Sequence, residues 1–504
     1  MLLKEFAADY TGQRRAKPRV AQLRRAILSP SERRDVTSYK QLESQNAMTT
    51  LVEQLSAYAA ALRYEDLPGE VVGQAKRLIV DTVGCALGGS TSGPARIARE
   101  IAGAVTGRPP ARVMVSGEGT SPDLATFANG VMIRYLDFND GYTSTGESGH
   151  PSDSIAPVLT LSEWKQRSGR DAIVATVLAY EVFCRICDAA DLKPLGWDHV
   201  TVGGIASTAA AAKLLGLPEH KMAAAFNLGI APNIALYQTR IGHVSMWKGC
   251  AYANASRNAV FAALLAERGM TGPAPIFEGV GGYFKAVTRK PFALPALGGR
   301  EHPFKIMECS IKRFPLGQYS QTVVEAALAV REKISSPEEI AEVEIETVST
   351  AIRLMAGDPD KWAPETRETA DHSMPYTVAV ALIHGTVEAR HFDAAYLHDP
   401  AIRALTRRVK ARASEEADRR MPHAMLCTLT LTTRSGARHT AVVEYHRGHY
   451  RNPMSESELE HKFRTLARDV LAPRATDRLL ETLWRVETLE DAGEIVRLTL
   501  PGPG

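Results

Sequence analysis

Five stretches of this 504-residue chain place histidine, lysine and aspartate side chains where they could carry out acid–base chemistry. The first, RYLDFNDGYTSTGESGHPSDSIAP (134–157), has Asp137 and Asp140 at the end of an apolar helical pattern and His150 in the polar loop that follows. A carboxylate beside an imidazole fixes its tautomer and tunes its pKa, as a general acid or base requires. The structural alternative is that the aspartates cap a turn and His150 binds a loop carbonyl.

The second and third stretches each place a cation near the start of a predicted helix. GWDHVTVGGIAS (196–207) puts His199 at a helix N-terminus, where an anion is favoured and a substrate carboxylate could bind. A solvated loop histidine is the alternative. In SMWKGCAYANASRNAVFAALL (245–265), Lys248 follows the bulky Trp247, and partial shielding by an aromatic ring strengthens a contact with an anion. Most lysines are simply solvated, so this pattern is weak by itself.

The last two stretches lie at and after the point where the helical pattern gives way to a mixture of helix and strand patterns. CSIKRFPLGQYSQTVVEAALAV (309–330) sets Lys312 and Arg313 at a proposed domain junction, and clefts between domains are favoured ligand sites. Two cations there suit an anionic substrate, whereas a linker with solvated charges is the alternative. KWAPETRETADHSMPYTVAVALIHG (361–385) opens an apolar helix with three side chains that are either core hydrogen bonds or site residues: Asp371, His372 and Tyr376.

The cysteines do not form a metal-binding pattern. All six are scattered, and the Cys184-x-x-Cys187 pair lies in an apolar helical run with no second pair near it. A zinc or iron–sulfur site needs more ligands, and scattered free thiols are typical of a reducing compartment. The phosphate-binding patterns GxGxxG and the P-loop are absent, as is the GxSxG nucleophile motif. We therefore expect no metal site.

Charge is distributed unevenly along the chain. The net charge is +3, but residues 1–47 alone carry +5, which leaves the remainder at −2 and gives no sign of a nucleic-acid partner. Residues 1–47 lack the apolar core of a secretory signal, and we expect a disordered or spurious extension, with an Arg-rich transit peptide as the alternative. The apolar runs are shorter than the roughly 18 residues that a membrane span needs.

The secondary structure that we expect to position these residues differs between two parts of the chain. From Thr49 to about Pro303 apolar residues recur at helical spacing, with helices expected near 122–136, 153–167, 170–190, 201–215, 218–229 and 250–268. After Lys312 the pattern predicts a helix at about 320–333, a strand at 343–348, a helix at about 369–384 and a hairpin over 426–446. We therefore expect a mainly α protein with a smaller α+β domain.

Taken together, the segments RYLDFND with HPSD, GWDHVT, MWKGCA, IKRFP, RETADHSMPYTVAVAL and RGHYRNPMSESELEHKF resemble the MmgE/PrpD family, over about Leu51 to Leu498. The resemblance implies a large helical domain (48–306, with 452–504 returning to it) and an inserted α/β lid (307–451). It also implies a cytoplasmic homodimer that works without metal or organic cofactor. By motif position it implies catalytic residues Asp137, His150, His199 and Lys312, and substrate-binding residues Lys248, Arg313 and Tyr376.

The implied activity is that of a hydro-lyase, 2-methylcitrate dehydratase-like, which dehydrates a small polycarboxylate in propionate catabolism by His/Lys acid–base catalysis. A decarboxylase or isomerase of a cis-aconitate-like acid, or a non-catalytic carboxylate-binding relative, is the alternative. The chain departs from the family at Gly141, where relatives usually have Thr, and over Leu316 to Tyr319, where relatives often carry a Glu and a His. These departures indicate a changed pocket and leave the substrate identity open.

Overall fold

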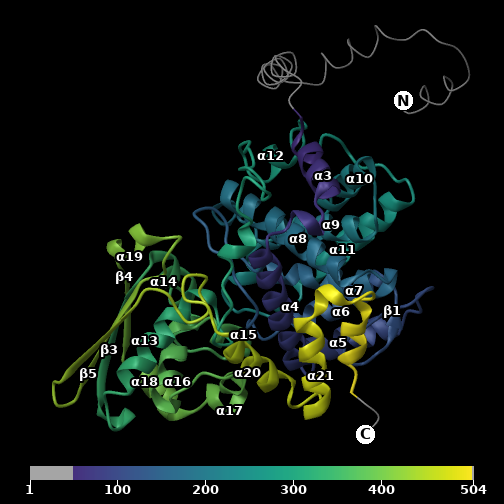
Figure 1. Cartoon of the computed structure of the whole chain (residues 1–504). Coiled ribbons are helices and arrows are strands. Elements are labelled where there is room, and N and C mark those ends of the chain that lie inside the picture. Colours follow the sequence, from purple (N-terminus) through teal and green to yellow (C-terminus); the bar gives the residue numbers. More distant parts are fainter. Residues whose placement is uncertain (1–48, 502–504) are drawn as a thin grey trace, which may run out of the picture. The chain divides into compact units, whose positions relative to one another are not determined.

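The computed structural model describes residues 49–501 (Figure 1). The predictions made for residues 1–47 therefore lie outside the described residues. Buried apolar side chains gather into two clusters, one drawn from residues 51–311 and 454–496 and the other from 314–431. We call the first region the helical body and the second, extended to Val443, the α/β module. No described helix is both long and apolar enough to span a membrane.

The helical body confirms that this part of the chain is mainly α-helical, as predicted. Its N-terminal part contains α3 (Leu51–Ala61), α4 (Gly69–Gly89), α5 (Gly93–Gly103), α6 (Pro122–Arg134), α7 (Ile155–Lys165), α8 (Gly169–Ala189), α9 (Val200–Leu214), α10 (Glu219–Ile230), α11 (Ala251–Glu267) and the short α12 (Tyr283–Ala286). A two-stranded antiparallel ribbon, β1 (Ala111–Arg112) and β2 (Gly119–Thr120), precedes α6. The C-terminal part adds α20 (Glu456–Ala467), α21 (Pro473–Trp484) and α22 (Gly493–Leu498).

Small residues allow the central helices of the body to approach closely. A Cβ at Gly130 of α6 would lie 2.8 Å from the Cβ of Ala253 on α11, and one at Gly203 of α9 would lie 2.3 Å from the ring of Tyr252. Larger side chains at these glycines would separate the helices. The Ala- and Gly-rich pattern of the sequence therefore brings α6, α9 and α11 together, and these three helices lead directly into the candidate site residues.

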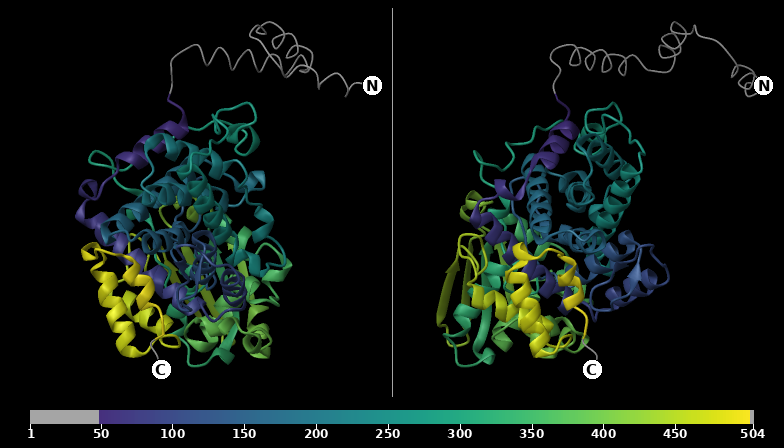
Figure 2. Two further views of the ribbon diagram at one scale, coloured as in Figure 1. Left: turned by 90° about the vertical axis from the view of Figure 1, so that its right-hand side faces the viewer. Right: turned by 45° about the vertical axis from the view of Figure 1, so that its right-hand side comes forward.

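The C-terminal helices return to the body beside α4, as Figures 1 and 2 show in yellow. Lys462 of α20 pairs with the buried Asp81 of α4 at 2.6 Å and donates to the carbonyls of Phe138 and Lys312 at 2.8 and 2.9 Å. One ammonium thus holds together two backbone segments that are far apart in the sequence. Both segments adjoin the candidate site, so the end of the chain helps to fix its geometry.

The α/β module is built on a mixed four-stranded sheet with the order β4-β3-β5-β6. Strand β3 (Ile340–Thr347) pairs parallel with β4 (Val409–Ala413) and antiparallel with β5 (Cys427–Thr433), which forms a hairpin with β6 (Arg438–Val443). Alternate residues of β5 are buried, and α13 packs on β5 and β6. The helices of the module are α13 (Gln321–Arg331), α14 (Ser349–Met355), α15 (Arg367–Ala370), α16 (Met374–His384), α17 (Ala394–Leu397), α18 (Pro400–Thr406) and α19 (Glu415–Arg420).

The predicted strand and hairpin are confirmed, whereas two features of the module differ from expectation. Gly436 makes the hairpin turn with φ +87°, a conformation that glycine adopts freely. The helix expected over 369–384 is interrupted, because Ser373 caps α16 by accepting from the amide of Tyr376. Strand β4 was not predicted, since VKARA has only five residues and its apolar positions are mostly alanine, which is depleted in strands. The proposed domain limits of 48–306, 307–451 and 452–504 stay a prediction.

The close approach of α4 to α6 requires a glycine at position 89. A Cβ there would lie 2.1 Å from the backbone oxygen of Met132, whereas a Cβ at Gly73 of the same helix meets nothing within 4 Å. We expect Gly89→Ala to destabilise the protein by about 1–3 kcal/mol, because backbone must move. Gly73→Ala should be neutral or stabilise it by up to about 1 kcal/mol. Urea unfolding of both variants checks this, and equal effects would contradict the packing described.

Candidate functional site

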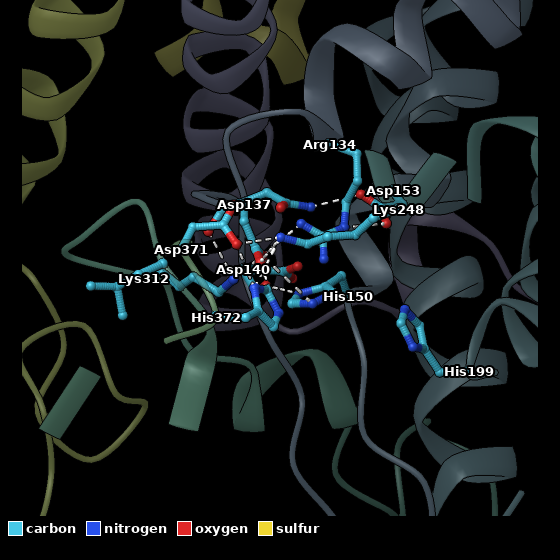
Figure 3. Close-up of polar contacts among 12 residues, drawn as sticks. Arg134, Asp137, Asp140, His150, Asp153, His199, Lys248, Lys312, Asp371 and His372 are labelled. Atoms are coloured by element: carbon cyan, nitrogen blue, oxygen red, sulfur yellow. Dashed lines mark hydrogen bonds and ion pairs between the residues drawn. The ribbon is translucent and has the colours of Figure 1, made fainter. Parts of the chain in front are cut away.

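A buried carboxylate, that of Asp137, lies at the centre of the candidate site (Figure 3). Helix α6 ends at Arg134, and Asp137 adopts a left-handed conformation with φ 50°, which aspartate tolerates better than most residues. This turn directs the carboxylate back toward its own helix, where Oδ1 lies 2.6 Å from Nη1 of Arg134. Nζ of Lys312 lies 2.5 Å from the same oxygen and 2.9 Å from the backbone carbonyl of Asp137.

The α/β module supplies the other side of this cluster. His372 lies in the interruption between α15 and α16, and its Nε2 is 3.2 Å from Oδ2 of Asp137. Nζ of Lys248 is 3.2 Å from the same oxygen, 2.9 Å from Nδ1 of His372 and 2.6 Å from Oδ1 of Asp371. Residues from the body and from the module therefore share one network of ions and hydrogen bonds.

The electrostatics of the cluster follow from burial and charge. Burial alone would raise the pKa of Asp137, but the charges of Arg134, Lys312 and Lys248 hold it well below its usual value. Burial, with the help of Arg134 and Lys248, lowers the pKa of Lys312 to about 8 despite its pairing with Asp137. A buried ammonium with such a pKa can release or take up a proton near neutral pH.

His150 is held as a neutral imidazole with a defined tautomer. Its Nδ1 lies 2.6 Å from the backbone carbonyl of Asp140, and since a carbonyl only accepts, Nδ1 carries the proton. Nε2 is then a free lone pair, 3.9 Å from Oδ1 of Asp137. Burial first, and then the charges of Arg134 and Lys312, lower the pKa of His150 well below its usual value. The group that orients His150 is thus a loop carbonyl rather than the carboxylate of Asp137.

His199 has a corresponding arrangement at the start of α9. Its Nδ1 lies 2.6 Å from Oδ1 of Asp198, and the second oxygen of Asp198 accepts from Nε of Arg240 at 2.9 Å. Burial lowers the pKa of His199. Nε2 of His199 and Nη2 of Arg240 are buried and have no hydrogen-bond partner within the described residues. The rings of His199 and His150 lie 5.5 Å apart at 75° to each other.

These side chains surround one pocket between the body and the α/β module. Its lining residues are Arg134, Thr143, Ser148, Gly149, His150, Lys193, His199, Tyr237, Arg240, Gln318, Tyr319, Leu354, Met355 and His372. Three cations, Arg134, Lys193 and Arg240, line it together with three imidazoles. Lys248 and Lys312 lie behind this lining, each bound to Asp137. The pocket therefore offers neutral proton acceptors beside positive charges that suit an anion.

One trio of groups has the donor atoms of a metal site. Ligand atoms of Asp137, Asp371 and His372 all lie within 4.8 Å of one another. The ammonium of Lys248 contacts all three, at 3.2, 2.6 and 2.9 Å. In this arrangement a side chain supplies the positive charge at the centre of the trio. A metal ion there would compete with Lys248 and would add charge beside Lys312 and Arg134.

The structure brings most of the predicted site residues together but not all. Asp137, His150, His199, Lys248 and Lys312 lie in or directly behind the pocket. Arg313 instead lies at the surface, with its side chain 48% exposed and facing Glu325. Tyr376 is buried in the core of the α/β module, where its hydroxyl donates to the carbonyl of His391 at 2.5 Å. Neither of these two side chains lines the pocket.

Several pocket residues were not predicted from the sequence. Arg134 ends α6 three residues before Asp137, and a spacing of three residues around a helix end could have indicated the pair. Lys193 and Arg240 belong to short 3₁₀ segments whose local patterns carry no distinctive signal, whereas Gln318 lies in the stretch Leu316 to Tyr319 that we expected to change the pocket. Asp371 and His372 were noted, but only the interruption between α15 and α16 places them at the pocket.

Comparison with known proteins gives two family matches. Residues 53–294 match the MmgE/PrpD N-terminal domain and residues 314–487 match the MmgE/PrpD C-terminal domain. The chain is 27% identical to a cis-aconitate decarboxylase of Homo sapiens, over 90% of this chain and 95% of the relative. It is 30% identical to a 2-methylcitrate dehydratase of Cupriavidus necator, over 69% and 74%. A 2-methylcitrate dehydratase of Escherichia coli K12 is 29% identical, over 71% and 78%.

The buried carboxyl group of Asp140, which lies beside the cluster, should make the stability of the protein depend on pH. Burial raises its pKa to about 6 from the ordinary 3.8, so the folded protein holds a proton there that the unfolded chain releases. This stabilisation is complete below pH 3.8 and is lost as pH rises to about 6. Asp140→Asn stays neutral at every pH. We expect the variant to gain on the order of 3 kcal/mol relative to the wild type between pH 4 and pH 7.

Urea unfolding at several pH values between 4 and 7 measures this difference. Asp360→Asn, which changes an exposed aspartate in the α/β module, is the matched control and should show no trend of this size. A difference between Asp140→Asn and the wild type that stays constant over this pH range would contradict the buried, protonated state of Asp140.

Proposed function

The chain belongs to the MmgE/PrpD family, and from this premise we propose that it is a hydro-lyase that removes water from a small polycarboxylate such as 2-methylcitrate. The relatives named above are lyases, which supports lyase activity in general. The observation that carries the finer proposal is the pair of neutral imidazoles, His150 and His199, which face a pocket lined by three cations.

The cations of the pocket suit a substrate with several carboxylates. Arg240 has Nη2 buried and unpaired within the described residues, so it can donate to an incoming carboxylate oxygen. Arg134 and Lys193 line the same pocket and can bind further carboxylates. Each ion pair formed in such a shielded place is stronger than one in water. Arg134 and Lys193 already pair with Asp137 and Glu147, so a small acid with two or three carboxylates would add to these pairs and would also satisfy Arg240. An apolar ligand would leave Nη2 of Arg240 unpaired.

Dehydration needs one group to accept a proton from carbon and another to donate a proton to the departing hydroxyl. The Nε2 atoms of His150 and His199 both carry lone pairs in the resting state. We assign one imidazole as the base and the other, once protonated, as the acid. The negative substrate raises the pKa of the imidazoles beside it, so that one of them takes up a proton when substrate binds. Loss of the C–H and C–OH bonds then yields a double bond and water.

The carbanion-like state places additional negative charge on the substrate carboxylates. The pocket cations stabilise that charge directly, each contributing a few kcal/mol in a dry site. Lys312 and Lys248 act from behind the lining, where they keep Asp137 ionised and add to the positive field. We therefore assign Asp137 and Lys312 to the catalytic network and Lys248 to the support of the bound anion.

Decarboxylation of a cis-aconitate-like acid is the second candidate. The observation that favours it is the length of the match to the human cis-aconitate decarboxylase, which covers 90% of this chain against 69% for the dehydratase of Cupriavidus necator. The same pocket could stabilise the carbanion that forms when carbon dioxide leaves. The products distinguish the reactions, because only decarboxylation releases carbon dioxide.

We also propose that the protein is a cytoplasmic homodimer that acts in propionate catabolism. The segment around Leu236 to Trp247 exposes large apolar side chains, among them Met246 and Trp247, which favours association with a second copy. Sedimentation equilibrium measures the mass directly. A mass of one chain at micromolar concentration would contradict the dimer without affecting the proposed reaction.

Incubation of the purified protein with a panel of citrate-type acids tests the proposed reaction. We expect 2-methylcitrate or a close relative to lose water, with the unsaturated product identified by NMR and mass spectrometry. Release of carbon dioxide from cis-aconitate would establish the second candidate instead. Tight binding of these acids without turnover would indicate a non-catalytic carboxylate-binding relative.

Replacement of His150 tests the assignment of the acid–base pair. We expect His150→Ala to lower turnover at least ~100-fold, because the proton acceptor is lost, while circular dichroism shows an intact fold. His220→Ala, which removes an exposed histidine at the start of α10, is the matched control and should retain activity. Near-normal turnover by His150→Ala would show that the assignment is wrong.

A further inference from the structure

The side chain of Gln318, which lines the pocket, lies in the space that a side chain at position 141 would take. A Cβ built on Gly141 would lie 1.4 Å from Oε1, 2.3 Å from Cδ and 2.9 Å from Nε2 of Gln318. The amide of Gln318 therefore lies where any other side chain at position 141 would begin. Gly141 belongs to the loop after α6, whereas Gln318 begins the 3₁₀ turn that leads into α13. The two residues connect the helical body with the α/β module.

The backbone at Gly141 has no freedom to relieve this conflict. Its amide donates to the carbonyl of Ser310 at 2.9 Å, and the amide of Ser310 donates back to the carbonyl of Gly141 at 2.9 Å. Gly141 also follows Asp140, whose carbonyl fixes the tautomer of His150. A shift of the loop to accommodate a side chain would disturb both. Only movement of Gln318 could accommodate a larger residue.

Gln318 itself is held in place and faces the pocket. Its Nε2 donates to Oγ1 of Thr143 at 3.0 Å, and the residue is 9% exposed. It lines the pocket together with His150 and His199. Its amide is a neutral donor and acceptor among cations that carry full charges. Carboxylates bind preferentially to the cations, so the group that fits an amide is an uncharged hydrogen-bonding group.

We propose that Gly141 and Gln318 form a linked specificity pair in which the Gln318 amide recognises a hydroxyl group of the substrate. The inference rests on the proposed function for the substrate class, a small polycarboxylate. Gly141 contributes by leaving room for the amide, and Thr143 contributes by orienting it. A chain with a side chain at position 141 would need a different residue at 318. The pair therefore selects hydroxylated acids over acids of the same shape that lack the hydroxyl.

The first test concerns the pairing alone and requires no substrate. We expect Gly141→Ala to lower the melting temperature by on the order of a few degrees, because the amide of Gln318 is displaced. The same change in a Gln318→Ala background should cost much less, since the space is then empty. In a Gln318→Met background, where a side chain of similar length remains, the cost should persist. An equal effect of Gly141→Ala in all three backgrounds would overturn the pairing.

The second test concerns recognition of the hydroxyl. Citrate and tricarballylate carry the same three carboxylates and differ by one hydroxyl group. Isothermal titration calorimetry should show that the wild type binds citrate roughly 3- to 10-fold more tightly, as one neutral hydrogen bond allows. Gln318→Met fills the space without an amide, and both it and Gln318→Ala should abolish the preference. A preference that survives in Gln318→Met, or its absence in the wild type, would overturn the assignment.

The two failures remain distinguishable. If neither acid binds the wild type, both the hydroxyl assignment and the proposed substrate class fail, whatever the melting temperatures show. If both acids bind and are not discriminated, the substrate class survives and only the role of Gln318 fails. The thermal comparison decides independently whether Gly141 and Gln318 depend on one another.

Discussion

The buried carboxylate of Asp137 is the feature on which the arrangement of the site depends. Removing a carboxylate from water costs several kcal/mol, and one partner rarely offsets that cost. Here Arg134 and Lys312 share one oxygen, while Lys248 and His372 approach the other. These partners come from α6, from the segment that enters the α/β module, from the 3₁₀ turn just before α11 and from the module itself. Ionised Asp137 thus requires that distant parts of the chain meet.

The same cluster determines the protonation states around it. The positive charges that keep Asp137 ionised also act on His150, where they reinforce the effect of burial and keep the imidazole neutral. A neutral imidazole beside cations is an effective proton acceptor for a C–H group next to a carboxylate. The imidazole takes up the proton, and the cations stabilise the negative charge that forms on the substrate. His199 reaches a similar state by a different route, since Asp198 fixes its Nδ1 proton while Arg240 balances the charge of Asp198.

Much of the fold could be predicted because its signals are local. The helical spacing of the body, the alternation in β3 and the turn at Gly436 depend on neighbours within a few residues, and the structure confirms them. Strand β4 was missed because it is short and two of its three apolar residues are alanine, a weak strand former. Arg313 and Tyr376 were expected in the site because their neighbours in the sequence belong there. Side-chain direction separates them from it, and direction depends on packing that local spacing does not encode.

The site shows the same distinction at the level of single residues. Sequence reasoning found the histidines and lysines, whose chemistry is visible in their identity, and it placed a carboxylate near an imidazole. It left open whether His150 binds a carboxylate or a loop carbonyl, and the structure has the loop carbonyl. It could not identify that carbonyl as the one of Asp140, because every residue has a carbonyl. Nor could it find that Gln318 fills the space beside Gly141, because this contact joins residues 177 positions apart and depends on how the helical body packs against the α/β module. Sequence reasoning expected departures from the family pattern at Gly141 and over Leu316 to Tyr319, and we propose that the first acts together with Gln318. Because Gly141 has no side chain, the amide of Gln318 can lie beside it. The hydrogen-bonding groups at this wall of the pocket therefore depend on how the body packs against the module.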